Sequence, residues 1–308
     1  MNENIAEQRA QIGAPELQQI APGVWAYIQP DGSWMVNNMG FIEGSRGNIS
    51  IDVTSTEKRT AAYLAAMKTA TGKGVRYLVY THAHPDHCNG ASLLEDAVIV
   101  AHEHARAELA SSQPVAGHIF TPFEQGGVRP REPEVTFTHS MNLYADEREV
   151  QLIHPGTRAH TGGDSYVWIP DVQVLFAGDL VFNGGTPFLM SGSPTGWLNA
   201  LSELRSLKPR VIVPGHGPVG GLELLDAMED YLRFIQDAAA EAKSKGLSPL
   251  EAAGQLDLGR FSGLLDSERI VGNLHSAYAE ISGEHVDHPT VFQEMFEYNG
   301  HRPLTCSA

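Results

Sequence analysis

A run of seven residues, THAHPDH at positions 81–87, places three histidines and one aspartate close together in the chain. Crowded imidazoles repel one another when they are protonated, whereas a bound cation keeps them neutral and ordered. Imidazole nitrogens together with carboxylate oxygens form a donor set that zinc and similar divalent metals accept. The run therefore predicts a metal site, and the alternative interpretation is a solvated, histidine-rich turn.

A second run, GHGPVG at positions 215–220, matches the glycine pattern G-x-G-x-x-G of dinucleotide-binding loops and follows a predicted strand. The dinucleotide-binding fold also needs a second parallel strand after the helix, where an acidic residue binds the ribose. The chain after Gly221 is predicted to be helical over a long distance and offers no such strand. We therefore reject a dinucleotide site at this run.

The histidine-rich run directly follows VRYLVY at positions 75–80, a β-branched and aromatic segment that predicts a buried strand. Residues 48–53 and 210–217 predict further strands, and residues 54–74 predict a helix with a Ser/Thr start and a glycine-rich end. This alternation favours an α/β fold in which two layers of sheet are covered by helices. Sites in such folds lie beyond the carboxyl ends of the strands, where the histidine-rich run stands.

Four further segments carry specific expectations. Roughly the first 20 residues predict a helical or loose lead-in, and Asp31-Gly32 predicts the tight turn of a β-hairpin. Residues 110–133, with several prolines and glycines, predict a long loop of the kind that is usually functional or poorly ordered. The predicted elements after Gly221 are all helices, so we expect a catalytic unit over residues 1–221 and a helical extension over residues 222–308.

The run at positions 81–87 resembles the HxHxDH signature of the metallo-β-lactamase fold superfamily. The family pattern continues downstream with a histidine, an aspartate and another histidine, each near the end of a strand. This sequence supplies His160, Asp179 and His216 in that order, so the resemblance covers residues 24–221. The resemblance implies a four-layer αββα sandwich, followed here by the C-terminal helical extension.

Carried over position by position, the resemblance implies two divalent metal ions. Zinc is the first candidate, and iron and manganese are alternatives that accept the same donors. The implied ligands are His82, His84 and His160 for the first ion, Asp86, His87 and His216 for the second, and Asp179 between the two.

The chemistry that the resemblance implies is hydrolysis by a hydroxide that bridges the two ions, because metal coordination lowers the pKa of bound water from 15.7 to about 7. Asp86 and Asp179 would keep this hydroxide oriented. Asp179 replaces a cysteine that lactamases of the superfamily use, so the ligand set is similar to those of the glyoxalase II and lactonase branches. We expect hydrolysis of an ester, lactone or thioester bond in a small, fairly apolar substrate.

Two alternatives stay open: a β-lactam hydrolase, and a non-catalytic metal-binding or sensor protein on the same fold. Trp34 and Phe182 are candidates for substrate contact in an apolar pocket, with ordinary core packing as the competing interpretation. Asp52 stands where the family often has a carboxylate that orients a ligand histidine; a helix cap or a polar strand end is the other interpretation. His102 follows a predicted strand and is a weaker candidate for approaching the site.

The composition excludes several other classes of protein. With 37 acidic residues against 21 Lys plus Arg, the chain has a formal net charge of −16, which disfavours nucleic-acid binding. No run of about 18 apolar residues predicts a membrane span, and the polar N-terminus lacks the apolar core of a secretory signal. We expect a cytoplasmic protein that acts on a small molecule, without a nucleic-acid or membrane partner. A homo-oligomer formed through the C-terminal helices stays open.

Overall fold

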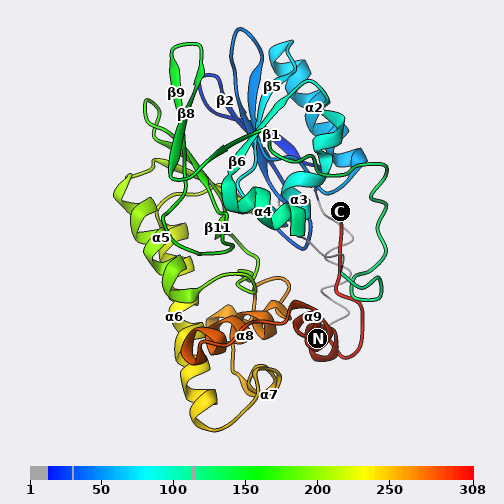
Figure 1. The fold of residues 1–308 in the computed structure, drawn as a ribbon, viewed down its shortest axis with the longest axis vertical. Helices are drawn as coiled ribbons and strands as arrows, with labels where there is room; N and C mark the ends of the chain where they lie inside the picture. Colours follow the sequence, from blue (N-terminus) through cyan, green and yellow to red (C-terminus); the bar gives the residue numbers. More distant parts are fainter. Residues whose placement is uncertain (1–12, 30, 112–114) are drawn as a thin grey trace.

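Two β-sheets lie face to face, and helices cover them and extend beyond one end (Figure 1). The structure, a computed structural model, describes residues 13–29, 31–111 and 115–308. The first sheet has the strand order β1 (Glu16–Ala21), β2 (Val24–Ile28), β3 (Met39–Ile42), β4 (Asn48–Ile51), β5 (Val75–Val79), β6 (Val98–His102) and β7 (Val135–Phe137). The second has the order β12 (Val211–His216), β11 (Val174–Phe182), β10 (Tyr166–Ile169), β9 (Arg148–Ile153) and β8 (Ser140–Ala145).

Helices flank both sheets and also form the C-terminal extension. Beside the sheets lie α2 (Glu57–Thr71), α3 (Pro85–Cys88), α4 (Glu103–Ser111) and α5 (Pro194–Ser206). The chain continues with α6 (Glu223–Ser244), α7 (Pro249–Gln255), α8 (Arg269–Ser282) and α9 (His288–Tyr298), and Asn89–Leu93 and Gly259–Phe261 form 3₁₀ turns. The limits of α2 follow from its sequence, since the Thr56 hydroxyl accepts the N–H of Arg59 and Gly72 ends the helix at φ +71°.

Apolar side chains fill the space between the two sheets. They include Ile42, Ile51 and Val79 from the first sheet and Val167, Phe176 and Val213 from the second. On the outer face of the first sheet, Tyr63 of α2 packs near Phe41. On the outer face of the second sheet, the buried Trp197 of α5 donates its indole N–H to the carbonyl of Leu180. The order helix, sheet, sheet, helix confirms the predicted four-layer αββα sandwich.

Parallel strands bring the chemically interesting segments to one edge of the sandwich. Strands β4, β5 and β6 run parallel in the first sheet, and β11 and β12 run parallel in the second. The carboxyl ends of parallel strands meet at the same edge of a sheet. The Ser165 N–H donates to the Thr81 carbonyl across 2.7 Å, which fastens the segment after β5 to the second sheet. Residues 81–87 therefore stand between the two sheets at their common edge.

Two expectations about the N-terminal region are wrong. Residues 16–21, predicted as a helical or loose lead-in, form the edge strand β1, whose partly exposed side chains give no clear apolar alternation; residues 1–12 lie outside the described part of the chain. Strands β2 and β3 pair antiparallel, but a long loop connects them instead of a tight turn at Asp31-Gly32. The Asn38 amide explains the loop, because it donates to the carbonyls of Pro214 and Gly217 and so holds the loop against the second sheet.

The C-terminal helices share a continuous apolar core with the second sheet. Leu180 and Phe182 of β11 belong to the same buried cluster as Leu224 of α6 and Ile270 of α8. The chain after α9 returns toward the sheets, where Leu304 pairs with Phe120 (Figure 1). The division of the chain at residue 221 stays a prediction. Within the described ranges, no helix combines the length and apolarity that crossing a membrane requires.

Candidate metal centre

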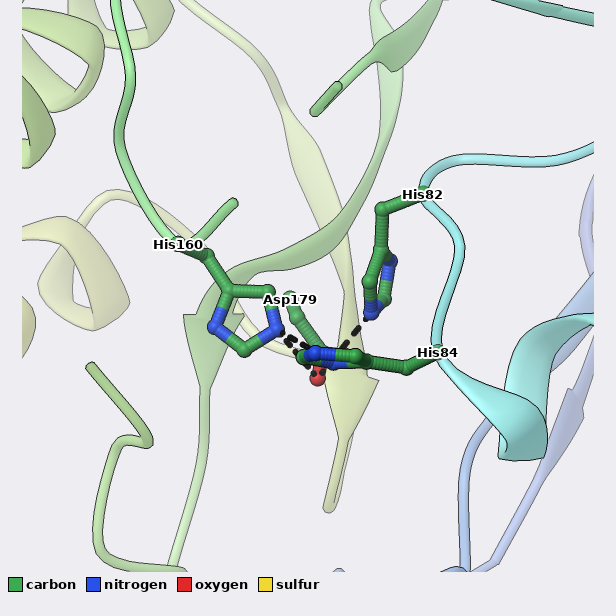
Figure 2. Close-up of side chains that lie close together, drawn as sticks. All are labelled: His82, His84, His160 and Asp179. Atoms are coloured by element: carbon green, nitrogen blue, oxygen red, sulfur yellow. Dashed lines mark hydrogen bonds and ion pairs between the residues drawn. The ribbon is translucent and has the colours of Figure 1, made fainter. Parts of the chain in front are cut away.

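Seven side chains converge at the edge where the two sheets meet. The loop after β5 carries His82 and His84, α3 carries Asp86 and His87, the loop between β9 and β10 carries His160, and β11 and β12 carry Asp179 and His216. In the part of the chain that the structure describes, they form two groups, and within each group the potential ligand atoms lie within 4.8 Å of one another. The first group is His82, His84, His160 and Asp179 (Figure 2), and the second is Asp86, His87 and His216.

In the first group, three imidazoles and one carboxylate lie close together. His84 Nδ1 lies 2.9 Å from His160 Nε2, and the Asp179 carboxylate oxygen Oδ2 lies 3.4 Å from His160 Nε2 and 3.8 Å from His82 Nε2. Figure 2 shows the three imidazoles pointing toward this carboxylate from two separate loops. Three nitrogens and one oxygen thus surround a common point, as four-coordinate metal sites require.

The second group shares Asp179 with the first. Asp86 Oδ2 lies 3.3 Å from His216 Nε2 and 3.7 Å from His87 Nε2. Asp179 faces the same two histidines, with Oδ1 3.2 Å from His87 Nε2 and Oδ2 3.4 Å from His216 Nε2. The carboxylate of Asp179 therefore lies between the two groups and can contact a cation in either one.

The outer nitrogens of four histidines are held by hydrogen bonds. His82 Nδ1–H donates to Thr81 Oγ1 at 3.1 Å, and His87 Nδ1–H donates to Asp52 Oδ2 at 2.8 Å. His160 Nδ1–H donates to the Phe188 carbonyl at 2.6 Å, and His216 Nδ1–H donates to the Val36 carbonyl at 3.1 Å. A proton fixed on Nδ1 leaves the lone pair of Nε2 free on the side that faces the carboxylates. Such hydrogen bonds orient a ligand histidine and raise the basicity of its metal-facing nitrogen.

Three inward-facing atoms support the view that these residues fit a metal. His82 Nε2, His87 Nε2 and Asp179 Oδ1 are buried without a well-formed hydrogen bond among the described residues, although the last two face each other at 3.2 Å. Leaving a buried polar atom unpaired costs about 1–3 kcal/mol. A divalent cation satisfies nitrogen lone pairs and carboxylate oxygens together, so the donor chemistry of this centre matches such an ion.

The protonation of the histidines follows from burial and from the nearby carboxylates. Burial lowers the pKa of His82 and His84, and lowers that of His160 to about 3, so these three imidazoles are neutral. Burial also opposes the cationic form of His216, but Asp179 and Asp86 outweigh it and raise the pKa of His216 to about 9. A proton there balances the carboxylates, and a bound metal ion would take its place.

Asp52 and Phe182 lie directly against the second group. The Asp52 carboxylate accepts Nδ1–H of His87 and both the N–H and the hydroxyl of Thr81, each at 2.8 Å. Burial raises the pKa of Asp52, and His87 partly opposes this rise. The ring of Phe182 stacks on His216 at 5.2 Å, with 5° between the ring planes. Phe182 therefore forms an apolar wall of the centre.

Trp34 and His102 lie farther from the seven side chains. The ring of Trp34 packs edge-on against Phe188 and Phe120, and its indole N–H donates to Glu268 at the start of α8. The structure does not bring His102 to the centre. Its ring stacks on His154 at 3.9 Å, and its Nε2–H donates to the Thr138 carbonyl. The expectation that His102 approaches the site is therefore wrong.

Sequence reasoning missed the backbone carbonyls of Phe188 and Val36, because a carbonyl belongs to every residue type and leaves no signal in the sequence. It also missed Asp164, whose buried carboxylate accepts the N–H of His160 at 2.7 Å and the N–H of Thr161 at 2.8 Å. Asp164 accepts from residues that precede it in the chain, whereas the Asx turn that sequence can indicate pairs an aspartate with the backbone two residues further on, so the run HTGGD did not indicate this contact.

The glycines of residues 215–220 are explained by packing at this centre. A side chain at position 215 would overlap the Asp179 carboxylate, and Gly217 has φ +87° with no room for a Cβ beside the Asn183 carbonyl. Close approach of the two strand ends, β11 and β12, therefore requires these glycines. The glycine pattern belongs to the candidate metal centre, which supports the rejection of a dinucleotide site.

Replacing Gly215 by alanine is expected to lower the free energy of unfolding by about 1–3 kcal/mol, because the added methyl group pushes against Asp179 and the Gly178 backbone. Displacement of Asp179 should also weaken metal binding. Thermal unfolding and a metal titration measure the two effects. Gly254→Ala, in the exposed part of α7 with open space around it, is the matched control and should stabilise the protein by about 0.4–1 kcal/mol. Equal behaviour of the two variants would contradict the packing argument.

The fold and the centre together define a class of protein: a four-layer αββα sandwich with clustered histidines and aspartates that could hold two divalent cations at one edge. The family model of the metallo-beta-lactamase superfamily matches residues 32–216, which is more than half of the chain. The protein therefore belongs to the metallo-beta-lactamase superfamily, as the resemblance of the HxHxDH run predicts.

Comparisons with individual proteins agree with this membership. A linear primary-alkylsulfatase of Pseudomonas sp. (strain ATCC 19151) is 25% identical over 261 residues, which cover 70% of this chain and 49% of the alkylsulfatase. A metallo-beta-lactamase type 2 of Bacillus sp. (strain 170) is 27% identical over 234 residues, 72% of this chain and 84% of that protein. The metallo-beta-lactamase FIM-1 of Pseudomonas aeruginosa, solved in its mono-zinc form, superposes with a TM-score of 0.58 at 21% identity, over 73% and 98% of the two chains. The chain thus spans about half of the alkylsulfatase and most of the lactamases.

Proposed function

We propose that this protein is a metal-dependent hydrolase whose centre holds two divalent metal ions, with zinc as the first candidate. The position of Asp179 carries this proposal, because its carboxylate faces His160 of the first group and His87 and His216 of the second at 3.2–3.4 Å. The buried Nε2 of His82, which has no hydrogen-bond partner among the described residues, also supports it. The alkylsulfatase and lactamase names of the relatives are names of hydrolases, and the mono-zinc form of one structural neighbour supports zinc.

Divalent metal ions at such a centre acidify water to give a nucleophile near neutral pH and polarise the bond that is cleaved. The residues of this chain prepare the centre for that chemistry. The hydrogen bonds to Nδ1 of four histidines hold the Nε2 lone pairs inward, and Phe182 excludes water from one side. Asp86 and His84 are the most exposed of the seven side chains, so substrate is expected to arrive on their side. We assign Asp86 and Asp179 the role of orienting the attacking water and accepting its proton.

The surroundings of the centre favour a small substrate with apolar parts. Phe182 and Phe188 contribute aromatic surface beside the histidines, with 6.4 Å between the ring centroids of Phe188 and His84, and Trp34 packs behind Phe188. We propose an ester, lactone or thioester as the scissile bond, in keeping with aspartate rather than cysteine at position 179. A β-lactam is the second candidate, because a metallo-beta-lactamase matches over 84% of its own length. Sulfate esters are included among the test substrates because an alkylsulfatase is another of the relatives.

A metal-loaded substrate panel tests the proposal. The protein is stripped with a chelator, reloaded with zinc, manganese or ferrous iron, and assayed on chromogenic carboxylic esters, lactones, thioesters, alkyl sulfates and a chromogenic cephalosporin. We expect up to two bound ions per chain and turnover of an ester-type substrate that is lost on stripping and restored on reloading. Absence of bound metal would refute the proposal. Two bound ions without turnover of any substrate would instead indicate a binding or sensor protein.

A further inference from the structure

One face of α8 binds the backbone of the segment 184–192, which follows β11. Arg269 Nη1 donates to the Thr186 carbonyl at 2.8 Å, Asn273 contacts Pro187 and Leu189, and Ser276 Oγ donates to the Gly192 carbonyl at 2.9 Å. Positions 269, 273 and 276 are spaced by four and three residues, so they share one face of the helix. The C-terminal extension therefore shapes a segment that belongs to the edge of the metal centre.

Asn273 makes the most specific of these contacts. Its side-chain oxygen accepts the N–H of Leu189 at 2.8 Å, and its amide group donates to the Pro187 carbonyl at 2.8 Å and to the Tyr231 hydroxyl oxygen at 2.7 Å. Asn273 and Leu189 are fully buried. The side-chain amide is thus fixed in one orientation, with contacts on both sides of Phe188.

The peptide group between Phe188 and Leu189 connects Asn273 to His160. Its N–H is the group that Asn273 binds, and its carbonyl is the group that accepts Nδ1–H of His160 at 2.6 Å. A peptide group is planar, so fixing its N–H also fixes the direction of its carbonyl. Hydrogen bonds in such a chain polarise one another, which makes the carbonyl a better acceptor and His160 Nε2 more basic.

We propose that Asn273 is a positioning residue of the metal centre, which acts through the Phe188–Leu189 peptide to orient His160 in the first metal group. This inference rests on the proposed function, because it takes His160 to be a metal ligand. It gives the C-terminal extension a role in the centre itself: α8 supplies the side chain that sets the direction of one ligand. The second group contains no histidine whose outer nitrogen depends on this segment, since His87 and His216 are held by Asp52 and Val36.

The test is a competition titration of stripped protein with zinc against a chromophoric chelator, which gives a separate dissociation constant for each group. Asn273→Ala is expected to weaken zinc binding about tenfold at one group and to leave the other unchanged. His160→Ala and His216→Ala identify the groups, and the constant that changes in Asn273→Ala must be the one that His160→Ala affects. Cobalt loading provides a second readout, because a reoriented His160 changes the visible absorption of the ion in the first group.

Ser276→Ala is the matched control, since it removes a hydrogen bond from the same helix face to the same segment without touching the Phe188–Leu189 peptide. It is expected to leave both dissociation constants unchanged. Tyr231→Phe preserves the test if Asn273→Ala does not fold, because it keeps the volume of the side chain and removes only the hydroxyl that accepts from the Asn273 amide; it should weaken zinc binding at the first group, by less than Asn273→Ala, and leave the second unchanged.

Three results would overturn the inference. Unchanged zinc binding in Asn273→Ala would refute the positioning role of Asn273 while leaving the proposed function intact. Equal weakening of both groups, in proportion to a loss of thermal stability, would assign Asn273 a purely structural role. A wild-type protein that binds no zinc would remove the proposed function and this inference together.

Discussion

Replacing Asp179 by alanine is expected to abolish measurable hydrolysis and to weaken metal binding at both groups. Its carboxylate faces His160, His87 and His216 at 3.2–3.4 Å, and in the described part of the chain the first group contains no other carboxylate. Metal-assisted catalysis contributes several kcal/mol, and a loss of about 4 kcal/mol corresponds to a rate about 10³-fold lower. The rate on the best panel substrate and the zinc content after dialysis measure both effects.

Two further variants make this prediction specific. Asp86→Ala should weaken zinc binding at the second group only, because the Asp86 carboxylate lies 3.3 Å from His216 Nε2 and 3.7 Å from His87 Nε2 and so belongs to that group. Asp171→Ala is the control, since that half-exposed aspartate pairs with Arg148 at the surface, and rate and zinc content should stay at the wild-type level. Retention of two tightly bound zinc ions in Asp179→Ala would contradict a carboxylate shared between the groups.

The layered fold could be predicted because its signals are local and repeated. Residues 77–80 are apolar without alternation and are buried from Leu78 onward, as expected of a buried parallel strand, and Thr56 and Gly72 mark the two ends of α2. Strand β1 gave no such signal, because an edge strand with half-exposed side chains is stabilised by pairing with β2 rather than by its own apolar pattern. The missed turn at Asp31-Gly32 has a similar cause, since contacts of Asn38 with the other sheet decide the path of that loop.

The candidate ligands could be found from sequence because metal binding restricts residue type. Histidine and aspartate at fixed spacing, as in residues 81–87, are informative, and the structure brings all seven candidates together. The groups that orient them are of two kinds. Asp52 can be proposed from sequence because its carboxylate is a feature of its residue type. The Phe188 and Val36 carbonyls belong to the backbone, so only the three-dimensional structure shows that they bind the histidines. Asn273, 113 positions after His160 in the chain, depends on the packing of α8, which no local pattern encodes.

Replacing Asp52 is expected to lower both protein stability and metal affinity, and two different replacements should lower them to different extents. Asp52 is buried at φ +58° and accepts two hydrogen bonds from Thr81 and one from His87. Asp52→Ala leaves these buried donors without an acceptor and places alanine in a left-handed conformation, so the free energy of unfolding should fall by about 3–5 kcal/mol. Zinc binding at the second group should weaken about 10–100-fold, because His87 loses the partner that orients it.

Asp52→Asn is expected to behave differently from the alanine variant. Asparagine tolerates the left-handed conformation and keeps one oxygen for Thr81, so less than half of the stability loss should remain. An amide N–H that faces His87 Nδ1 favours the tautomer with its proton on Nε2, which removes the metal-facing lone pair. Zinc binding at the second group should therefore weaken at least as much as in Asp52→Ala, while thermal unfolding stays closer to the wild type.

Asp146 provides the matched control for this series. It also has a positive φ, +56°, and its carboxylate accepts the N–H and the hydroxyl of Ser45, but it lies at the surface and outside both candidate metal groups. Asp146→Ala and Asp146→Asn should leave both zinc dissociation constants unchanged and should affect stability less than the changes at position 52. Parallel losses of stability and zinc affinity in both Asp52 variants would mean that Asp52 supports the fold alone. A zinc affinity that falls while stability is kept in Asp52→Asn would identify the Asp52–His87 hydrogen bond as the contact that prepares His87 to bind metal.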